Sequence, residues 1–378
     1  MRAFFYSVAV LIYKEALMIF KDKRGRLILV MPVLIQTLLF GYVATFELNR
    51  VDYAVLDEDR SQASRDLIRE FDGSPIFHRV VNLNNADEIA PTLDRRQALL
   101  VLHVGASFEH TLNVGRAAPV QILVDGRNSN VAGIAAGYGQ EMIARFNQKR
   151  LKERLNIYPP VTITSRAWFN PNLETRWNIL SGLLAVLSVL QVMILAGQSV
   201  AREKETGTFD QLLVTPLTTK AMMLGKAIPP VLVGVMQSSL VLFVAVHWFL
   251  VPFSGSFLLL LAGLLVFNSA IVGIGLCISV LTTTMQQALL YTFSLLMPMI
   301  LLSGFISPVS SMPEVFQWAT LINPVRYGVN LTQRIYLEGA GFADVWRNFA
   351  ALFLIAAVTW SATSLLFRTK MGGGFGKK

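Results

Sequence analysis

Long runs of apolar residues divide the chain into membrane-spanning and polar parts. A span needs about 20 apolar residues, because a helix rise of about 1.5 Å per residue then matches a hydrocarbon core roughly 30 Å thick. Six stretches meet this requirement, namely 27–46, 178–200, 227–251, 257–282, 286–306 and 346–367. The sequence therefore predicts an α-helical integral membrane protein with six transmembrane helices.

A different pattern fills residues 47–177, between the first and second predicted spans. Short apolar runs that suit strands lie at 51–56, 77–82, 98–104 and 119–124. Helical patterns alternate with them at 61–71, 86–95, 107–114 and 128–155. Alternating strands and helices indicate an α/β domain with a small mixed or parallel sheet. We therefore expect an α/β domain inserted between the first two transmembrane helices.

The segments beside the spans carry an uneven charge, which predicts their orientation. The arm before Leu27 holds six Lys and Arg residues, segment 201–226 holds four and the tail 368–378 holds four. Short loops on the opposite side carry none or few, and 252–256 has none. Because Lys and Arg in short loops mark the cytoplasmic side, we expect both termini there. Residues 47–177 and the loop 307–345 are then extracytoplasmic.

Composition supports a membrane protein and disfavours a nucleic-acid-binding one. The 378 residues are 53% hydrophobic and 15% charged, whereas soluble domains are about a quarter charged. Residues 47–177 are neutral, with 16 basic and 16 acidic side chains, so the net charge of +9 lies outside them. A nucleic-acid partner would need a basic patch on a folded domain. Cys277 is the only cysteine, which rules out an intramolecular disulfide framework.

The first 26 residues predict an amphipathic helix at the cytoplasmic membrane surface. Apolar side chains that share one helical face are Phe4, Val8, Leu11, Ile12 and Ile19. The charged candidates on this interfacial helix are Lys14, Glu15, Lys23 and Arg24. A cleaved signal peptide is the alternative, but charges interrupt its apolar core and no small-residue cleavage site follows.

Polar residues inside the spans are amides and hydroxyls rather than charges. An ion-coupled carrier usually places carboxylates, His or Lys at membrane depth, and these spans have no Asp, Glu, Lys or Arg at their centres. The candidate residues of a transport pathway are Gln191, Gln237, Asn268 and Ser294. Interhelical hydrogen bonding is the alternative role for each of them.

We expect no catalytic residues, no metal site and no cofactor on this chain. The tail Gly372–Lys378 lacks the spacing G-x-x-x-x-G-K-[ST] of a nucleotide-binding loop. Acidic residues follow two predicted strands, at Asp57 and Asp125, where turns and helix caps explain them. No nucleophile elbow or zinc-type His spacing accompanies them.

One cytoplasmic segment carries a resemblance to a known family. Residues 203–208, Glu-Lys-Glu-Thr-Gly-Thr, are followed by Gln-Leu-Leu-Val-Thr-Pro at 211–216. This stretch resembles the signature of ABC-2 type transporter permeases, the membrane subunits of ATP-binding cassette exporters. The resemblance extends over the whole chain, including Asn-Pro-Asn-Leu at 170–173 and the segments 302–308 and 323–327. It is strongest to bacterial multidrug-type permeases with a large periplasmic domain.

The resemblance implies an inner-membrane exporter subunit that works with other chains. A second permease copy, identical or homologous, and a separate ABC ATPase carrying ATP and Mg would complete the transporter. Membrane lipids surround it, and a periplasmic adaptor of the membrane-fusion type is a further expected partner. The ATPase would contact the N-terminal helix 1–26 and the coupling loop 201–226. The implied coupling residues are Arg202, Glu203, Glu205, Gly207, Thr208, Leu212, Leu213 and Pro216.

The implied substrate is hydrophobic or amphipathic, either drug-like or lipid-like, because the predicted lining is mostly apolar. Two other classes stay open from the residues. One is a membrane-anchored envelope sensor or assembly protein, in which the spans only anchor the external domain. The other is an ion-coupled secondary carrier, which the missing membrane carboxylates disfavour.

Overall fold

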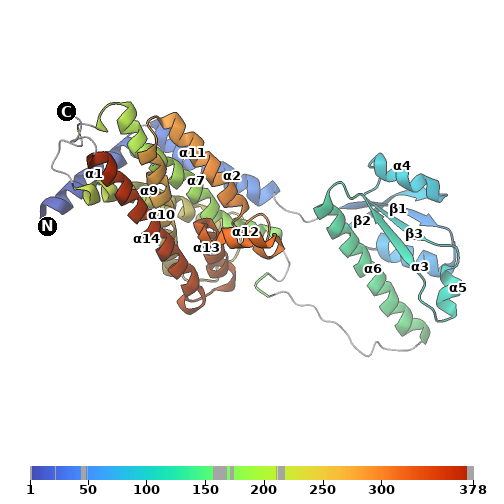
Figure 1. Cartoon of the computed structure of the whole chain (residues 1–378). Coiled ribbons are helices and arrows are strands. Elements are labelled where there is room, and N and C mark those ends of the chain that lie inside the picture. Colours follow the sequence, from blue (N-terminus) through green and yellow to red (C-terminus); the bar gives the residue numbers. More distant parts are fainter. Residues whose placement is uncertain are drawn as a thin grey trace. The chain divides into compact units, whose positions relative to one another are not determined.

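The computed structural model describes residues 2–21, 23–43, 48, 50–155, 168–170, 174–209, 211 and 218–372 (Figure 1). The chain forms two compact units. One is helical and comprises Met1–Thr45 and Ala167–Lys378, and the other is an α/β unit of residues Phe46–Arg166. Each unit has a hydrophobic core of its own.

The α/β unit contains a four-stranded mixed sheet of order β2-β1-β3-β4. Its strands are β1 (Val51–Asp57), β2 (Phe77–Leu83), β3 (Leu100–Val104) and β4 (Val120–Val124). β1 pairs in parallel with β2 and β3, whereas β4 runs antiparallel to β3. Every strand lies where the alternating pattern predicts one, and the prediction of a mixed or parallel sheet is confirmed.

Helices cover the sheet through two apolar clusters. They are α3 (Gln62–Asp72), η1 (Ala86–Glu88), α4 (Ile89–Asp94), α5 (Phe108–Asn113) and α6 (Ser129–Leu155). The larger cluster includes Tyr53, Phe71 and Phe77, whose rings lie 5.0–5.7 Å apart between their centroids. Residues of α3, α5 and α6 belong to it. Leu56 and Val101, which point to the other face, pack with residues of α4.

The helical unit contains long apolar helices and one shorter helix. They are α1 (Arg2–Phe20), α2 (Lys23–Val43), α7 (Thr175–Glu205), α9 (Thr219–His247), α10 (Phe257–Leu281), α11 (Met285–Leu301) and α14 (Phe342–Gly372). Among the described residues, five helices are long and apolar enough to cross a membrane. The remaining predicted span corresponds to α11, which has 17 residues and is therefore only about 26 Å long.

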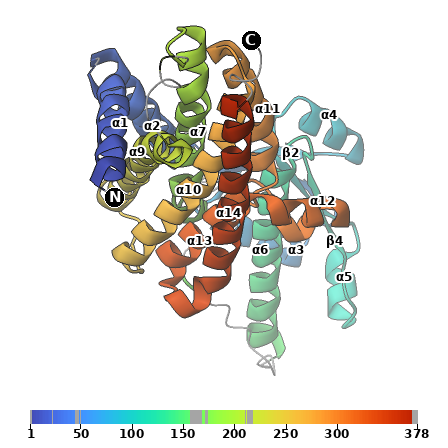
Figure 2. The same ribbon diagram turned by 60° about the vertical axis from the view of Figure 1, so that its left-hand side comes forward.

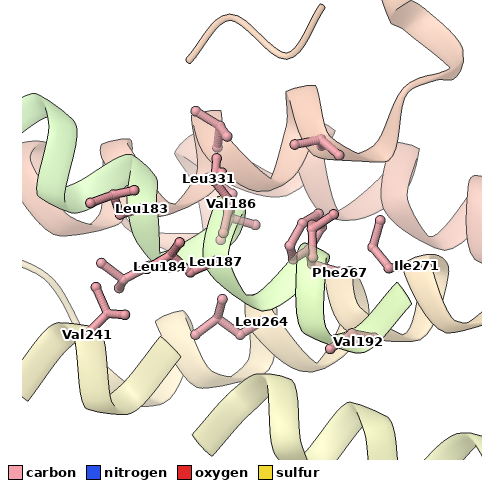
Figure 3. Packing of buried hydrophobic residues seen from close by; sticks show 14 of the residues in the cluster. Leu183, Leu184, Val186, Leu187, Val192, Val241, Leu264, Phe267, Ile271 and Leu331 are labelled. Atoms are coloured by element: carbon pink, nitrogen blue, oxygen red, sulfur yellow. The ribbon is translucent and has the colours of Figure 1, made fainter. Parts of the chain in front are cut away.

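Helix α7 lies at the centre of this unit and packs against α9, α10, α11 and the short helix α13 (Pro324–Gln333). Figure 3 shows Leu184 and Leu187 of α7 on the side of Leu264 of α10, with Val241 of α9 beside Leu184. The helices approach closely where side chains are small. A Cβ atom added to Gly275 would lie 2.7 Å from the Cβ of Ala196.

The segment after α11 is more ordered than the predicted loop 307–345. It contains η2 (Val309–Ser311), α12 (Glu314–Ala319), η3 (Thr320–Ile322), α13 (Pro324–Gln333) and the π-helical turn η4 (Arg334–Glu338). Helix α13 packs against α7, α10 and α14. Gly328 lets α13 lie directly on Phe267 of α10, so the segment predicted as the external loop contains helical structure that packs on the bundle.

Candidate functional site

The first helix lies against the start of α9 (Figure 2). Gly225 makes this close approach possible, since a Cβ atom there would lie 2.5 Å from the Cβ of Leu11. Of the predicted apolar face, Val8 and Leu11 are buried, whereas Phe4, Ile12 and Ile19 are half-buried. Glu15 is also buried, at 6% exposure. It therefore belongs to the packed face of α1 and not to the solvated face.

Four charged side chains from three helices meet beside this contact, and we call them the ion-paired quartet: Lys14, Glu15, Glu203 and Lys226. The ammonium Nζ of Lys226 lies 2.9 Å from Oε1 of Glu15 and 2.7 Å from Oε2 of Glu203. Lys14 Nζ donates to Oε1 of Glu203 over 2.8 Å. Two positive and two negative charges balance within the quartet.

The quartet is largely shielded from water. The side chain of Lys226 is 0% exposed, and those of Glu203 and Glu15 are 5% and 8% exposed. Lys14, at 40%, is the member that reaches the surface. The 2.7 Å contact between Lys226 and Glu203 is an ion contact without hydrogen-bond geometry, since Oε2 of Glu203 accepts no hydrogen bond from any residue that the structure describes. Buried charges of this kind persist only when they are paired.

The last turn of α7 is tied to the opposite side of the bundle by two further charges. Lys204 Nζ donates to the carbonyl oxygens of Val280 and Thr282, at the end of α10. Oε2 of Glu205 accepts the backbone N–H of Met285, at the start of α11, over 2.6 Å. Three consecutive residues, 203–205, therefore link α7 to α1, α9, α10 and α11.

Helix α7 ends directly after this charged turn. Thr206 is the C-cap residue of this helix, and its hydroxyl donates to the carbonyl oxygen of Arg202 over 2.9 Å. Gly207 follows with a φ of 71°, a left-handed conformation that glycine adopts without strain. Phe209 then packs into a buried cluster with Met222, Met223 and Phe367.

The predicted coupling residues differ in exposure. Glu203 is buried and Glu205 is exposed, and both bond within the unit; Gly207 and Thr208 are exposed and Arg202 is half-buried. Leu212, Leu213 and Pro216 lie outside the described residues. Lys23 and Arg24 are the first two residues of α2, and their side chains lie outside the described part of the structure.

The predicted pathway residues do not form one group. Gln237 is buried and donates to the carbonyl oxygen of Leu29 over 2.8 Å, an interhelical hydrogen bond from α9 to α2. Asn268 is fully buried against Gly234, one turn from Gln237, and its amide has no partner among the described residues. Gln191 is half-buried, and Ser294 is exposed.

Sequence reasoning missed Lys226 as a site residue. It counted this lysine among the loop charges, but α9 begins at Thr219, so Lys226 lies inside a helix and is buried. Ser199 was also missed, and its backbone carbonyl and hydroxyl oxygens each lie 3.4 Å from Lys226 Nζ. The sequence signal that could have identified Lys226 is its position directly after Gly225 and at the edge of an apolar run.

In the α/β unit, the acidic residues that follow strands serve local structure. Asp57 accepts the backbone N–H of Arg60, and Asp125 accepts that of Arg127. The turn role predicted for both aspartates is confirmed. Among the described residues, no three His, Cys, Asp or Glu side chains are grouped to hold a metal ion.

Comparison with known proteins gives matches over nearly the whole chain. The family described as "ABC-2 family transporter protein" matches residues 23–365. The chain is 39% identical to the "Probable multidrug ABC transporter permease YbhR" of Escherichia coli K12, covering 97% of this chain and 100% of that protein. It is 31% identical to "Probable multidrug ABC transporter permease YbhS" of the same strain, over 94% and 96%. The "Inner membrane transport permease YhhJ" of that strain is 30% identical, over 95% and 96%.

Proposed function

Because the chain belongs to the ABC-2 family of transporter proteins, we propose that it is an exporter permease powered by an ATPase on a separate chain. The sequence itself contains no nucleotide-binding loop. The permease would supply the path through the membrane, and ATP binding and hydrolysis with Mg would take place on the partner. A second permease copy would complete the membrane part.

The linkage of the last turn of α7 is the observation that carries this proposal. Residues 203–205 connect four other helices through ion pairs and hydrogen bonds to backbone groups. A force applied to α1, or to the exposed turn at Gly207 and Thr208, would therefore reach the bundle through short contacts, of which the ion pair between Lys226 and Glu203 is buried. This arrangement suits a surface that receives a conformational change from an ATPase. Tightly packed helices switch between discrete arrangements and do not deform continuously. A shift of one helix is therefore passed on to the helices that it contacts.

We propose that the substrate is hydrophobic or amphipathic. The long helices are predominantly apolar, and the relatives YbhR and YbhS bear names that describe multidrug permeases. Two buried polar residues support this class in one respect, because Gln237 of α9 and Asn268 of α10 are uncharged amides. Export would follow if the substrate binds the inward-open and outward-open states with different affinity.

The proposed topology has six spans, with α11 as the fifth, and both termini in the cytoplasm of a bacterial inner membrane. The Lys and Arg bias of the short loops supports this orientation. The α/β unit would then be periplasmic, and docking of a membrane-fusion-type adaptor is the role we propose for it.

The test is reconstitution of the permease in lipid vesicles with the ATPase that co-purifies with it. The permease alone should hydrolyse no ATP, and the complex should hydrolyse ATP and export a hydrophobic dye. Gly207→Pro should uncouple hydrolysis from export, because proline cannot adopt a φ of 71°. The matched control is Gly207→Asn, since asparagine tolerates the left-handed region and no atom lies within 4 Å of this position. Equal export by both variants would remove this turn from the coupling path, and dye export by the permease alone in an ion gradient would favour a carrier.

A further inference from the structure

An arginine-rich cavity of about 370 Å³ lies in the α/β unit, between helix α3 and the neighbouring strands β1 and β2. Its charged lining includes four guanidinium groups, those of Arg60, Arg65, Arg69 and Arg79. The transport function proposed above makes no use of it. Its size lies at the lower end of the range of about 300–1,000 Å³ that is typical of small-molecule sites.

A β-bulge in the edge strand places two polar side chains in this cavity. Arg79 pairs with Tyr53 and Val81 with Ala54, so Val80 is the extra residue of β2. In a regular strand, residues three apart point to opposite faces. The bulge reverses the alternation, and Arg79 and Asn82 both line the cavity. Bulges of this kind commonly redirect a side chain beside a functional site.

Helix α3 and the turn before it supply the other three arginines. Arg65 and Arg69 are four residues apart and share one helical face. Arg60 precedes the N-cap Ser61 and has a φ of 48°, an uncommon value for a residue with a side chain. Such backbone strain persists where the surrounding structure enforces it.

The two carboxylates of the cavity already have donors of their own. Asp57 accepts the backbone N–H of Arg60 over 2.9 Å and the hydroxyl of Ser64 over 2.8 Å. Asp72 accepts the hydroxyl of Tyr53 over 2.7 Å, and its other oxygen lies 3.0 Å from Arg79. Burial and the bond to Asp72 raise the pKa of Tyr53, so its hydroxyl remains a donor. The lining itself has four guanidinium groups and two carboxylates, and Asp66, outside the lining, pairs with Arg69 over 3.1 Å, so positive charge remains in excess around the cavity.

Most of the guanidinium donors remain available to a ligand. Arg65 uses two N–H groups, toward the carbonyl oxygen of Arg60 and the side chain of Gln62, and Arg69 uses one toward Asp66. The guanidinium of Arg60 has no hydrogen-bond or ion-pair partner within the described α/β residues 50–155. Each guanidinium carries five donors in a planar fork that matches phosphate and carboxylate oxygens. The bonds already formed hold Arg65 and Arg69 in place beside the cavity.

We propose that this cavity binds a phosphomonoester, with the phosphate on the arginines and the attached polar group beside Asn82 and Asn84. A phosphomonoester presents three terminal oxygens and up to two negative charges to these donors, whereas a carboxylate presents two oxygens and one charge. The cavity has room for a group of the size of glycerol or a monosaccharide beyond the phosphate. A soluble metabolite and a lipid headgroup share this chemistry.

Calorimetric titration of the purified full-length protein in a detergent without phosphate tests the proposal. Glycerol 3-phosphate is the soluble probe and glycerol its uncharged control. Nanodiscs that contain phosphatidic acid present the same group on a lipid. We expect saturable binding of glycerol 3-phosphate, no binding of glycerol, and an affinity that falls with added salt. Competition by phosphatidic acid nanodiscs, stronger than by nanodiscs of neutral lipid, would assign the group to a lipid, and lack of competition to a soluble ligand.

Three sets of variants localise the binding. Arg65→Gln with Arg69→Gln should weaken glycerol 3-phosphate binding by about tenfold or more, since two charge-assisted contacts are lost. Arg145→Gln is the matched control, because Arg145 is an exposed arginine of α6 that pairs with Glu141 away from the cavity. Arg60→Gln should weaken binding without affecting folding, because its guanidinium has no partner in the described α/β residues.

Absence of saturable binding, or equal weakening by Arg145→Gln, would overturn the proposal. If the double variant proves sensitive to protease, the Arg60→Gln result decides, and unchanged affinity there would also overturn it. These outcomes are independent of ATPase coupling and export, so failure here leaves the proposed transport function standing.

Discussion

Replacing Lys226 by methionine tests whether the ion-paired quartet holds α1 on the bundle. Methionine has a similar length and no charge, so the change removes the ammonium and little packing volume. Glu15 and Glu203 would remain buried at 8% and 5% side-chain exposure, with only the partly exposed Lys14 to balance them. The perturbation is therefore mainly electrostatic.

The expected loss follows from the two contacts of the ammonium. Its distances of 2.9 and 2.7 Å to carboxylate oxygens correspond to about 6 kcal/mol each at an effective dielectric constant of about 20. Desolvation of the buried ions offsets several kcal/mol per ion. Removing one partner of a buried pair typically costs about 3–5 kcal/mol, because a charge is left uncompensated. We expect Lys226→Met to lower the free energy of unfolding by that amount.

Equilibrium unfolding of the purified protein in mixed micelles of mild detergent and SDS measures this free energy. Tryptic cleavage after Lys14 reports the release of α1, since this residue becomes accessible if the helix detaches. The matched control is Lys220→Met, at an exposed position of the same helix. It should change the free energy of unfolding by no more than about 0.5 kcal/mol.

A triple variant separates charge from packing. Lys226→Met combined with Glu15→Gln and Glu203→Gln leaves no uncompensated buried charge, so it should recover most of the lost stability. A loss below about 1 kcal/mol in Lys226→Met would refute the reasoning. So would a triple variant less stable than the single one, because lost packing and not unpaired charge would then explain the effect.

Three further predictions concern topology, the α/β unit and acid stability. In a Cys277→Ala background, Asp87→Cys should react with a membrane-impermeant thiol reagent from the periplasm and Lys220→Cys should not; the reverse would overturn the orientation. A short flexible linker in place of residues 52–160 should preserve ATPase binding and basal hydrolysis but abolish export across the envelope, and surviving export would refute the docking role. Hydrogen bonds from Arg127 lower the pKa of Asp125 to about 2, so its ionised form stabilises the α/β unit above about pH 4 and this contribution is lost as the pH falls toward 2. Pepsin sensitivity should therefore rise over that interval, and less steeply in Asp125→Asn; identical profiles would contradict this assignment.

The sheet of the α/β unit was predictable because its strands carry their own local signals. Each strand is a short apolar run bounded by polar turn residues, and the observed strands differ from the predicted ones by two residues or fewer at each end. The bulge at Val80 was not predictable in this way. It depends on how β2 pairs with β1, and the arginine-lined cavity depends on the bulge.

The fifth apolar stretch shows where hydropathy fails to define a boundary. The pattern predicts a span at 286–306, but α11 ends at Leu301, after Pro298. The chain then turns at Gly304, whose φ is 87°. Apolar residues continue past the helix because the turn and α13 pack against the bundle. Burial and membrane exposure produce the same apolar signal in a sequence, so length alone could not separate them.

The quartet was beyond sequence reasoning for a related reason. Lys226 and Glu15 are separated by 211 positions, and each looks like an ordinary charge at the edge of an apolar run. Only the packing of α1 on α9 at Gly225 brings them together. Their pairing nevertheless leaves the orientation argument intact. Lys and Arg influence topology while the helices are being inserted, before tertiary packing can bury them. Lys14 and Lys226 can therefore act first as cytoplasmic charges and later as internal partners of the two glutamates.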